Sequence, residues 1–363
     1  MLYYIGTKIK NIMENKKLKV CFFGIYNPEY SRNRVLMSGL MENGVEVIEC
    51  RSDKKGLLKY FDLMKKHWKI RKSYNVLFVA FPGFQTMILA KFLTRKKIIF
   101  DCFAPLYESE VLDRGNTKQG SLKAKYYWWL DKFSARLADK VLLDTDEHIK
   151  YFVKEFGLNP SVDGEKFKRI FVGTSPDFFC PKDKLGKNNI FVVQFHGNYI
   201  PLQGVDYIME AINLMRNNKE VRFNLIGSNI KEKFYDKNIT NVDFKENVPV
   251  ENLVEYISEG DICLGIFGDR QKTQRVIPNR IYECIACKKP MITADTPAIR
   301  ELFNENDLYL ISEANPQGLV RAILKLKEDK RLGEKLAENA YNKLIQKAIP
   351  DILAKELIKI INE

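Results

Sequence analysis

The chain has 363 residues, of which 45% are hydrophobic and 29% are charged. This length exceeds what one hydrophobic core usually serves, so it predicts two globular domains. No apolar run approaches the roughly 18 residues that a membrane-spanning helix requires, and the first residues lack the order of a signal peptide. The seven cysteines are scattered along the chain, which predicts reduced thiols in a cytoplasmic protein and no metal site.

The net charge of +13 is distributed unevenly. Residues 1–180 contain 32 Lys and Arg against 20 Asp and Glu, whereas the remaining residues contain 27 against 26. A basic first half beside a neutral second half indicates that the first half meets something anionic. No nucleic-acid recognition motif accompanies this charge, so a nucleic-acid partner is not expected.

Strands and helices alternate along the first half. The predicted strands are residues 18–24, 45–50, 75–81, 97–101, 140–144 and 169–173. The predicted helices between them are residues 34–42, 85–94, 121–137 and 146–156. The strand at 75–81 is a continuous apolar run, which is typical of a strand buried on both faces. Repeated strand–helix–strand units of this spacing predict a doubly wound parallel sheet.

A polar segment at 181–189 is the predicted linker, and the alternation restarts after it. The predicted strands are residues 190–197, 221–227, 242–244, 261–268 and 291–294. The predicted helices are residues 204–216, 250–258, 278–287, 297–303, 316–328 and an amphipathic stretch at 332–362. We therefore expect two Rossmann-like domains, at 1–180 and 190–345, facing each other across a ligand-binding cleft. Residues 346–363 are expected to form a C-terminal helix that packs back.

The segment FHGNYIPLQGVDYIMEAI (195–212) combines a strand, a polar loop and a helix. Gly197 and Gly204 flank the loop, so a ligand can approach its backbone closely. The helix that follows presents unpaired N–H groups and the positive end of its dipole to an anion. The pattern predicts a phosphate loop, although a purely structural strand–Gly–helix turn is the open alternative.

A second segment, residues 269–295, places several cations before a helix. Its basic residues are Arg270, Lys272, Arg275 and Arg280, and Pro278 stands at the expected start of the helix. Cations gathered at a helix start are typical of a pocket for a diphosphate. Glu283, about one turn inside the helix, can accept hydrogen bonds from two neighbouring ribose hydroxyls. A solvated basic loop with a surface glutamate is the alternative.

Together the two segments resemble the nucleotide-sugar half of the family-4 retaining glycosyltransferases, which have the GT-B fold. The matched positions are the loop from Gly197 to Gly204, Gly227 after the next strand, Val248 in the base-contacting segment, and the helix head Pro278, Asn279, Arg280 and Glu283. The resemblance continues in the first half through residues 22–34, 100–109 and 138–148. It covers nearly the whole chain.

The resemblance implies retaining transfer of a hexose-type sugar from a UDP- or GDP-sugar to a lipid-linked or cell-surface glycan, with no metal or other cofactor. Arg275 and Arg280, with helix N-termini, would stabilise the leaving diphosphate, and Glu283 would hold the ribose. Asn198 and Gln203 replace the Arg and Lys that relatives place near the diphosphate, and Arg275 replaces a glutamate. These departures leave open a catalytically inactive sugar-nucleotide-binding subunit. A nucleotide-sugar 2-epimerase is the other alternative.

In the first half, three residues are candidates for substrate contacts. Asp101 ends a predicted strand where many relatives carry a histidine, so the resemblance implies a contact with the donor sugar or an acceptor hydroxyl. A helix cap or Asx turn is the alternative. Arg32 and Arg34 could meet an anionic acceptor, or could be ordinary charges at a helix start.

Residues 53–72 (DKKGLLKYFDLMKKHWKIRK) predict a basic amphipathic helix. Its apolar face contains Leu57, Leu58, Phe61, Met64 and Trp68. Basic amphipathic helices that carry a tryptophan lie in the interface of anionic bilayers. We therefore expect a cytoplasmic protein at the inner face of the cell membrane, with a helix packed on its own sheet as the alternative.

Overall fold

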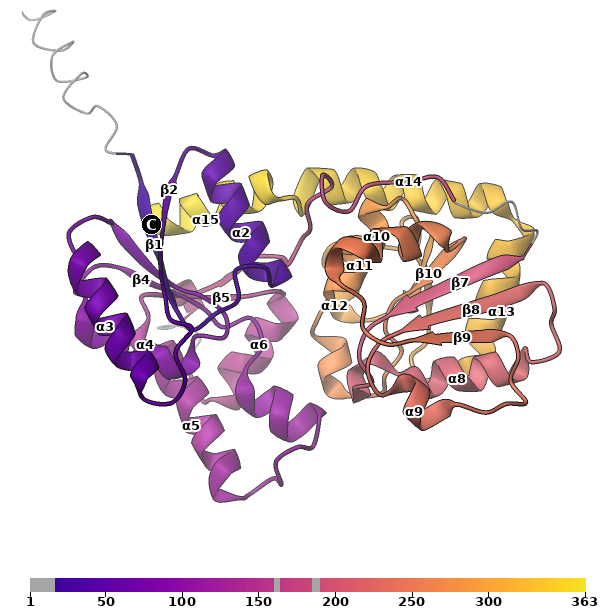
Figure 1. The fold of residues 1–363 in the computed structure, drawn as a ribbon, viewed down its shortest axis with the longest axis horizontal. Helices are drawn as coiled ribbons and strands as arrows, with labels where there is room; N and C mark the ends of the chain where they lie inside the picture. Colours follow the sequence, from indigo (N-terminus) through magenta and orange to yellow (C-terminus); the bar gives the residue numbers. More distant parts are fainter. Residues whose placement is uncertain (1–16, 160–163, 185–189) are drawn as a thin grey trace, which may run out of the picture.

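The computed structural model describes residues 17–159, 164–184 and 190–363. These residues form two domains, each built on a six-stranded parallel sheet (Figure 1). The predicted doubly wound fold is therefore confirmed. Of the predicted linker, residues 185–189 lie outside the described part of the chain, and residues 181–184 form neither helix nor strand. No helix in the described ranges combines the length and the apolar character needed to cross a membrane.

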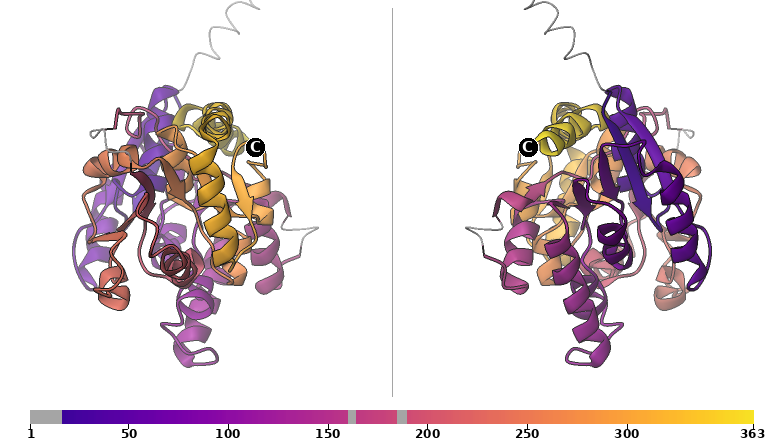
Figure 2. Two further views of the ribbon diagram at one scale, coloured as in Figure 1. Left: turned by 90° about the vertical axis from the view of Figure 1, so that its right-hand side faces the viewer. Right: turned by 90° about the vertical axis from the view of Figure 1, so that its left-hand side faces the viewer.

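The first domain has the strand order β2-β1-β3-β4-β5-β6. The strands are β1 Lys19–Gly24, β2 Glu46–Arg51, β3 Val76–Val79, β4 Ile98–Asp101, β5 Lys140–Leu143 and β6 Phe167–Arg169. The connecting helices are α2 Ser31–Glu42, α3 Leu58–Ile70, α4 Phe84–Leu93, α5 Leu122–Leu137 and α6 Asp146–Glu155. Strand β3 is fully buried, as its continuous apolar sequence predicts, and β4 is fully buried as well. In both side views, α5 and the loop before it project beyond the rest of the molecule (Figure 2).

The second domain has the order β12-β11-β10-β7-β8-β9. Its strands are β7 Phe191–His196, β8 Val221–Ile226, β9 Val242–Lys245, β10 Ile262–Leu264, β11 Met291–Ala294 and β12 Tyr309–Ile311. Its helices are α8 Val205–Leu214, α9 Ile230–Phe234, α10 Val250–Glu259, α11 Asn279–Ala286, α12 Pro297–Arg300 and α13 Pro316–Glu328. The strand order reverses beside β7, and open parallel sheets bind ligands at such a point.

The sequence missed several short elements. They are the π-helical turn η1 Glu108–Asp113, the 3-10 turns η2 Gly164–Lys166, η3 Pro201–Gln203 and η4 Gln271–Gln274, helix α9 and strand β12. Each is too short to show a hydrophobic period. The strand predicted at 169–173 was placed too late, because β6 ends at Arg169. The next carbonyls, of Ile170 and Phe171, accept hydrogen bonds from Arg32 Nη1 at 2.6 and 2.9 Å.

The C-terminal stretch predicted as helical consists of two helices, α14 Lys330–Lys347 and α15 Pro350–Asn362. They are separated at Pro350, because proline cannot continue a preceding helix without a break. Helix α14 packs on α11 of the second domain, and α15 packs on α2 of the first (Figure 1). A Cβ atom on Gly39 of α2 would lie 2.1 Å from the Pro350 carbonyl oxygen. The predicted packing-back of the C-terminal helix is confirmed.

Candidate functional site

A cavity of about 360 Å³ lies between the two domains. The first domain contributes Tyr30, Phe103, Ala104 and Asp144. The second contributes residues from the loop after β7 and from the segment that leads into α11. Seven of the predicted site residues line it: the donor-binding residues Gly197, Asn198, Gln203, Pro278, Asn279 and Glu283, and the catalytic candidate Arg280. The structure therefore brings the two predicted segments together, as their order in a doubly wound sheet requires.

Arg280 is a buried cation on this cavity. Its side chain packs over the Phe195 ring at 4.1 Å, and the residue is only 4% exposed. Its Nε and Nη1 atoms have no hydrogen-bond partner among the described residues. Burial lowers the pKa of Arg280 to about 10, so the guanidinium stays charged at neutral pH. A buried charge is costly unless something pairs with it, so this arrangement fits the binding of an anion.

Gly197 and Gly227 allow the loop after β7 to pass close to the neighbouring strand. Gly227 has φ +157°, and a Cβ atom there would lie 2.0 Å from the Gly197 carbonyl oxygen. Gly204 starts α8 with φ +68°, in the left-handed region that favours glycine. Part of the glycine pattern is thus explained by the chain's own packing, which was the structural alternative for this loop.

Glu283 lines the cavity one turn inside α11. One of its carboxylate oxygens lies 3.0 Å from His196 Nε2. Burial lowers the pKa of His196, although Glu283 opposes the shift, so the imidazole is neutral at neutral pH. A neutral imidazole with Nε2 protonated donates to Glu283 and orients its carboxylate. Sequence reasoning missed His196, although its position as the last residue of β7 was available as a signal.

The two neutral side chains of the loop supply no positive charge. Asn198 Oδ1 accepts a hydrogen bond from Ser228 Oγ at 2.8 Å. Gln203 Oε1 is buried and has no partner in the described part of the chain. Among the described residues that line the cavity, the cations are Arg280 and Lys272.

Arg275 is not part of the cavity lining. Its Nη1 donates to Glu108 Oε1 at 2.8 Å, and its guanidinium lies over the Tyr151 ring at 3.6 Å. The prediction that Arg275 meets the diphosphate does not fit this geometry, because a carboxylate of the first domain already pairs with it. Lys272 does line the cavity, and its Nζ lies 2.7 Å from Ser109 Oγ and 3.8 Å from Glu108 Oε2.

The substrate contacts predicted for Asp101 and Arg32 are corrected. Both residues are fully buried and form an ion pair with Nη2–Oδ1 at 2.9 Å. Arg32 Nε also donates to the Asp101 carboxylate, and Nη1 donates to the carbonyls of Ile170 and Phe171. Neither side chain lines the cavity, so the pair joins the end of β4 to the segment after β6 rather than binding substrate.

Four further predicted residues, Gly204, Gly227, Arg34 and Val248, are not part of the cavity lining. The Arg34 guanidinium stacks over Phe178 at 4.2 Å, and its Nε and Nη1 have no hydrogen-bond partner among the described residues, so the predicted acceptor contact stays a prediction. Val248 is half-buried between β9 and α10. Its predicted backbone contact with the base stays a prediction.

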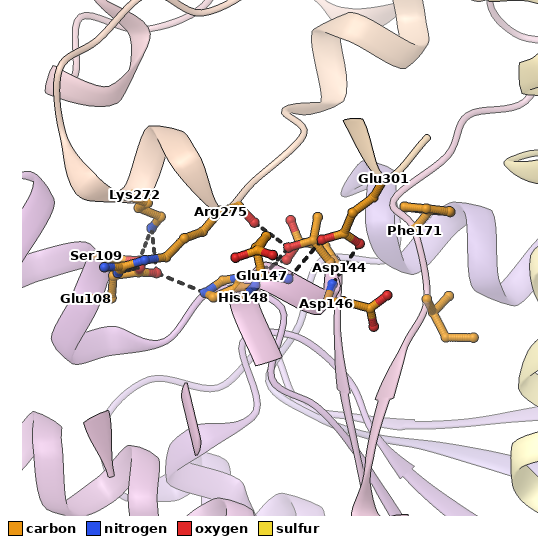
Figure 3. Close-up of polar contacts among 12 residues, drawn as sticks. Glu108, Ser109, Asp144, Asp146, Glu147, His148, Phe171, Lys272, Arg275 and Glu301 are labelled. Atoms are coloured by element: carbon orange, nitrogen blue, oxygen red, sulfur yellow. Dashed lines mark hydrogen bonds and ion pairs between the residues drawn. The ribbon is translucent and has the colours of Figure 1, made fainter. Parts of the chain in front are cut away.

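A buried polar network joins the domains beside the cavity (Figure 3). His148 Nδ1 lies 2.6 Å from Asp144 Oδ1, and its Nε2 lies 2.9 Å from Glu108 Oε2. Burial opposes charge on His148, but the two carboxylates outweigh it and raise the pKa of His148 to about 9. Burial likewise opposes charge on Glu108, but His148, Lys272 and Arg275 lower its pKa to about 2. Sequence reasoning missed this network.

Solved structures share this two-domain arrangement. Sucrose-phosphate synthase from Thermosynechococcus elongatus is 13% identical, with a TM-score of 0.72 over 95% of this chain and 98% of that one. Anabaena HepE in complex with UDP-glucose is 14% identical, with a TM-score of 0.68 over 95% and 99%. An alpha-glucosyltransferase in complex with UDP-glucose and DNA is 14% identical, with a TM-score of 0.69 over 96% and 100%.

The chain has the GT-B fold. Residues 208–358 also match the family model described as glycosyl transferase-like. In this GT-B chain the match covers most of the second domain, including α11 with Arg280 and Glu283.

One curated protein resembles the chain in sequence. It is the proline–tRNA ligase of Wigglesworthia glossinidia brevipalpis, 24% identical over 265 residues. The alignment covers 72% of this chain but only 37% of that protein. An identity this low, over about a third of the relative, does not establish a family.

Proposed function

We propose that the chain transfers a hexose-type sugar from a UDP- or GDP-sugar to a lipid-linked or cell-surface glycan, with retention of anomeric configuration. The observation that carries the proposal is the unpaired Arg280 guanidinium, buried beside Gly197 on the same cavity as Glu283. The match of residues 208–358 to the glycosyl transferase-like family supports it. The similarity to HepE and to the alpha-glucosyltransferase, both solved with UDP-glucose, supports the choice of donor.

The proposed chemistry depends on stabilising the leaving nucleoside diphosphate. Negative charge grows on the diphosphate as its bond to the anomeric carbon breaks, and a fixed buried cation lowers that barrier. Arg280 is placed to do this, and Lys272 lines the same cavity. Glu283, oriented by His196, would accept hydrogen bonds from the ribose hydroxyls. The reaction as proposed uses no metal ion or other cofactor, which stays a prediction.

A catalytically inactive sugar-nucleotide-binding subunit is the second candidate. It is favoured by the neutral side chains of Asn198 and Gln203 on the cavity and by the pairing of Arg275 with Glu108. Both proposals expect a nucleotide-sugar to bind, but only the first expects nucleotide to be released.

The test is a thermal-shift screen against UDP-, GDP- and ADP-sugars, followed by a nucleotide-release assay with glycolipid and glycan acceptors. Stabilisation by one donor together with acceptor-dependent release supports the transferase. Stabilisation without release, over a panel of acceptors, supports the inactive subunit. Free UDP together with a 2-epimerised sugar would indicate the epimerase instead. No stabilisation by any donor would contradict all three.

We also propose that α3 binds the anionic surface of the inner membrane. The five apolar residues predicted for its face are 43–74% exposed, whereas its contacts with the sheet are made by Leu63 and His67. The helix does pack on its own sheet, as the alternative expects, but through Leu63 and His67 rather than through this apolar face. Exposed lysines adjoin the face at positions 54, 55, 65, 66, 69 and 72. Exposed apolar side chains bordered by lysines fit an anionic bilayer.

A further inference from the structure

Asp144 is a buried carboxylate on the first-domain wall of the cavity. It follows the last residue of β5, and it is 1% exposed. Strand β5 pairs in parallel with β4, so the carboxyl ends of the two strands lie at the same edge of the sheet. At that edge Asp101 turns into the protein to pair with Arg32, whereas Asp144 lines the cavity.

The two oxygens of Asp144 have different environments. Oδ1 lies 2.6 Å from His148 Nδ1. Oδ2 is buried and has no hydrogen-bond partner among the described residues. A buried carboxylate oxygen without a donor is costly, and most such atoms in proteins are satisfied. The cavity that Asp144 lines can hold the missing donor.

His148 and Glu108 hold this carboxylate in place. His148 is completely buried, and its raised pKa keeps it protonated at neutral pH, so both ring nitrogens donate. One donates to Asp144 and the other to Glu108, which in turn pairs with Arg275 of the second domain. With His148 protonated, Asp144 Oδ1 is occupied, and Oδ2 is the oxygen that has no donor among the described residues.

The second domain also fixes the helix that carries His148. Thr145 Oγ1 accepts the His148 backbone N–H at 3.0 Å. The Glu301 carboxylate, from the end of α12, accepts the backbone N–H groups of Asp146 and Glu147, both at 2.8 Å. Figure 3 shows these contacts converging on the start of α6. The position of Asp144 is therefore set by both domains when they lie in this arrangement.

The chemistry of the cavity indicates what Asp144 meets. Arg280 supplies positive charge for the diphosphate, so a carboxylate elsewhere on the wall fits a neutral hydrogen-bond donor rather than another anion. The aromatic rings of Tyr30 and Phe103 line the same cavity. Hydroxyl groups and apolar C–H faces together are the surface that a sugar ring presents.

We propose that Asp144 is a substrate-binding residue whose free oxygen accepts a hydrogen bond from a sugar hydroxyl in the cleft, with His148 and Glu108 as positioning residues. The inference rests on the proposed glycosyl transfer and deepens it. The hydroxyl belongs either to the transferred sugar or to the acceptor, and the two sources are separable by experiment.

The test is Asp144→Asn, which keeps the shape of the side chain but removes its charge. Three constants are measured: the Kd of UDP or GDP alone, the Kd of the nucleotide-sugar, and the KM of the acceptor. The variant loses a hydrogen bond to a charged group in the complex. We therefore expect either the Kd of the nucleotide-sugar or the KM of the acceptor to increase ten- to hundredfold, while the Kd of the nucleotide alone stays unchanged. An increase in nucleotide-sugar Kd identifies the transferred sugar, and an increase in acceptor KM identifies the acceptor.

Asp146→Asn is the matched control, since Asp146 lies two residues away and is not part of the cavity lining. It should leave all three constants unchanged. His148→Gln should change the same constant as Asp144→Asn by a smaller factor, because the carboxylate loses its fixed orientation. If the wild type binds the nucleotide-sugar and Asp144→Asn leaves all three constants unchanged, the inference about Asp144 is overturned but the proposed function is not. A wild type that binds no nucleotide-sugar overturns the proposed function and the inference with it.

Discussion

The guanidinium of Arg280 lies against the backbone of Gly197, where a Cβ atom would come within 2.8 Å of Nη2. The two residues belong to segments more than 80 positions apart, the strand end after β7 and the first turn of α11. Glycine leaves the space that the guanidinium occupies at the edge of the cavity. The cation is thereby held at the edge of the cavity that Gly197 and Glu283 also line.

Replacing Arg280 by methionine tests this cation. We expect the affinity for UDP or GDP to fall at least tenfold, because charge-assisted hydrogen bonds are worth about 1.5–3 kcal/mol each. The Tm should not fall below that of the wild type, since Nε and Nη1 of the buried guanidinium have no hydrogen-bond partner in the described part of the chain and methionine fills a similar volume. Isothermal titration calorimetry and thermal unfolding check the two effects. Arg321→Met, at an exposed position on α13, is the control and should change neither. An unchanged Kd in Arg280→Met would contradict the role.

Replacing Glu283 by alanine tests the proposed ribose contact. The variant should bind nucleotide more weakly and unfold thermally at nearly the wild-type temperature. It loses its bond to His196, but that imidazole is neutral and costs little to leave unpaired. Comparing the Kd of UDP with that of a 2′,3′-dideoxy analogue assigns the effect to the ribose. If Glu283→Ala binds UDP and the dideoxy analogue with the same Kd values as the wild type does, the carboxylate has another role.

The buried His148 predicts a pH dependence of stability. Its pKa rises from 6.5 in the unfolded chain to about 9 in the fold, so its stabilising contribution is complete below pH 6.5 and is lost as the pH rises through 9. The groups that face it are the Asp144 and Glu108 carboxylates and the Tyr151 ring. The loss should be up to about 3 kcal/mol.

Urea unfolding between pH 6 and 10 measures this dependence. In His148→Gln the free energy of unfolding should be lower at every pH, because Asp144 and Glu108 lose their shared cation. Its decrease between pH 6.5 and 9 should also be shallower than in the wild type. A variant with the same slope as the wild type would show that other groups titrate in this window.

Changing Lys65, Lys66 and Lys69 to glutamate tests the membrane surface of α3. Sedimentation with vesicles that contain anionic lipid should be abolished, because each basic residue near such a surface contributes about 1 kcal/mol and each reversal adds repulsion. The control changes three exposed lysines of α14, at positions 330, 335 and 347, to glutamate. That variant should sediment like the wild type. Undiminished sedimentation of the α3 variant would place the membrane contact elsewhere.

Local sequence patterns predicted most of the fold. The buried runs of β3 and β11 and the amphipathic pattern of α8 identify their elements without long-range information. For α3 the pattern predicted an apolar face but left open whether that face meets the sheet or a membrane. The structure shows that Leu63 and His67 face the sheet, which leaves Phe61 and Trp68 exposed.

The sequence predicted the cavity residues of the second domain well and those of the first domain poorly. Gly197, Arg280 and Glu283 follow motifs with fixed local spacing, and all three line the cavity. Whether Asp101 or Asp144 faces the cleft depends on which one meets an arginine from a distant helix. The pairing of Arg275 with Glu108 likewise joins residues of different domains. No local period encodes such contacts, so the sequence could not supply them.

At Pro350 the chain crosses from the second domain back to the first, so the first domain depends on residues from the end of the chain. The hydrophobic core beneath α2 includes Leu353, Leu357 and Ile361, from the far end of the chain. Residues 17–180 expressed alone would therefore lack one wall of their own core and present an apolar groove along α2. We expect such a fragment to aggregate, and to be recovered in soluble form when a peptide spanning α15 is supplied with it.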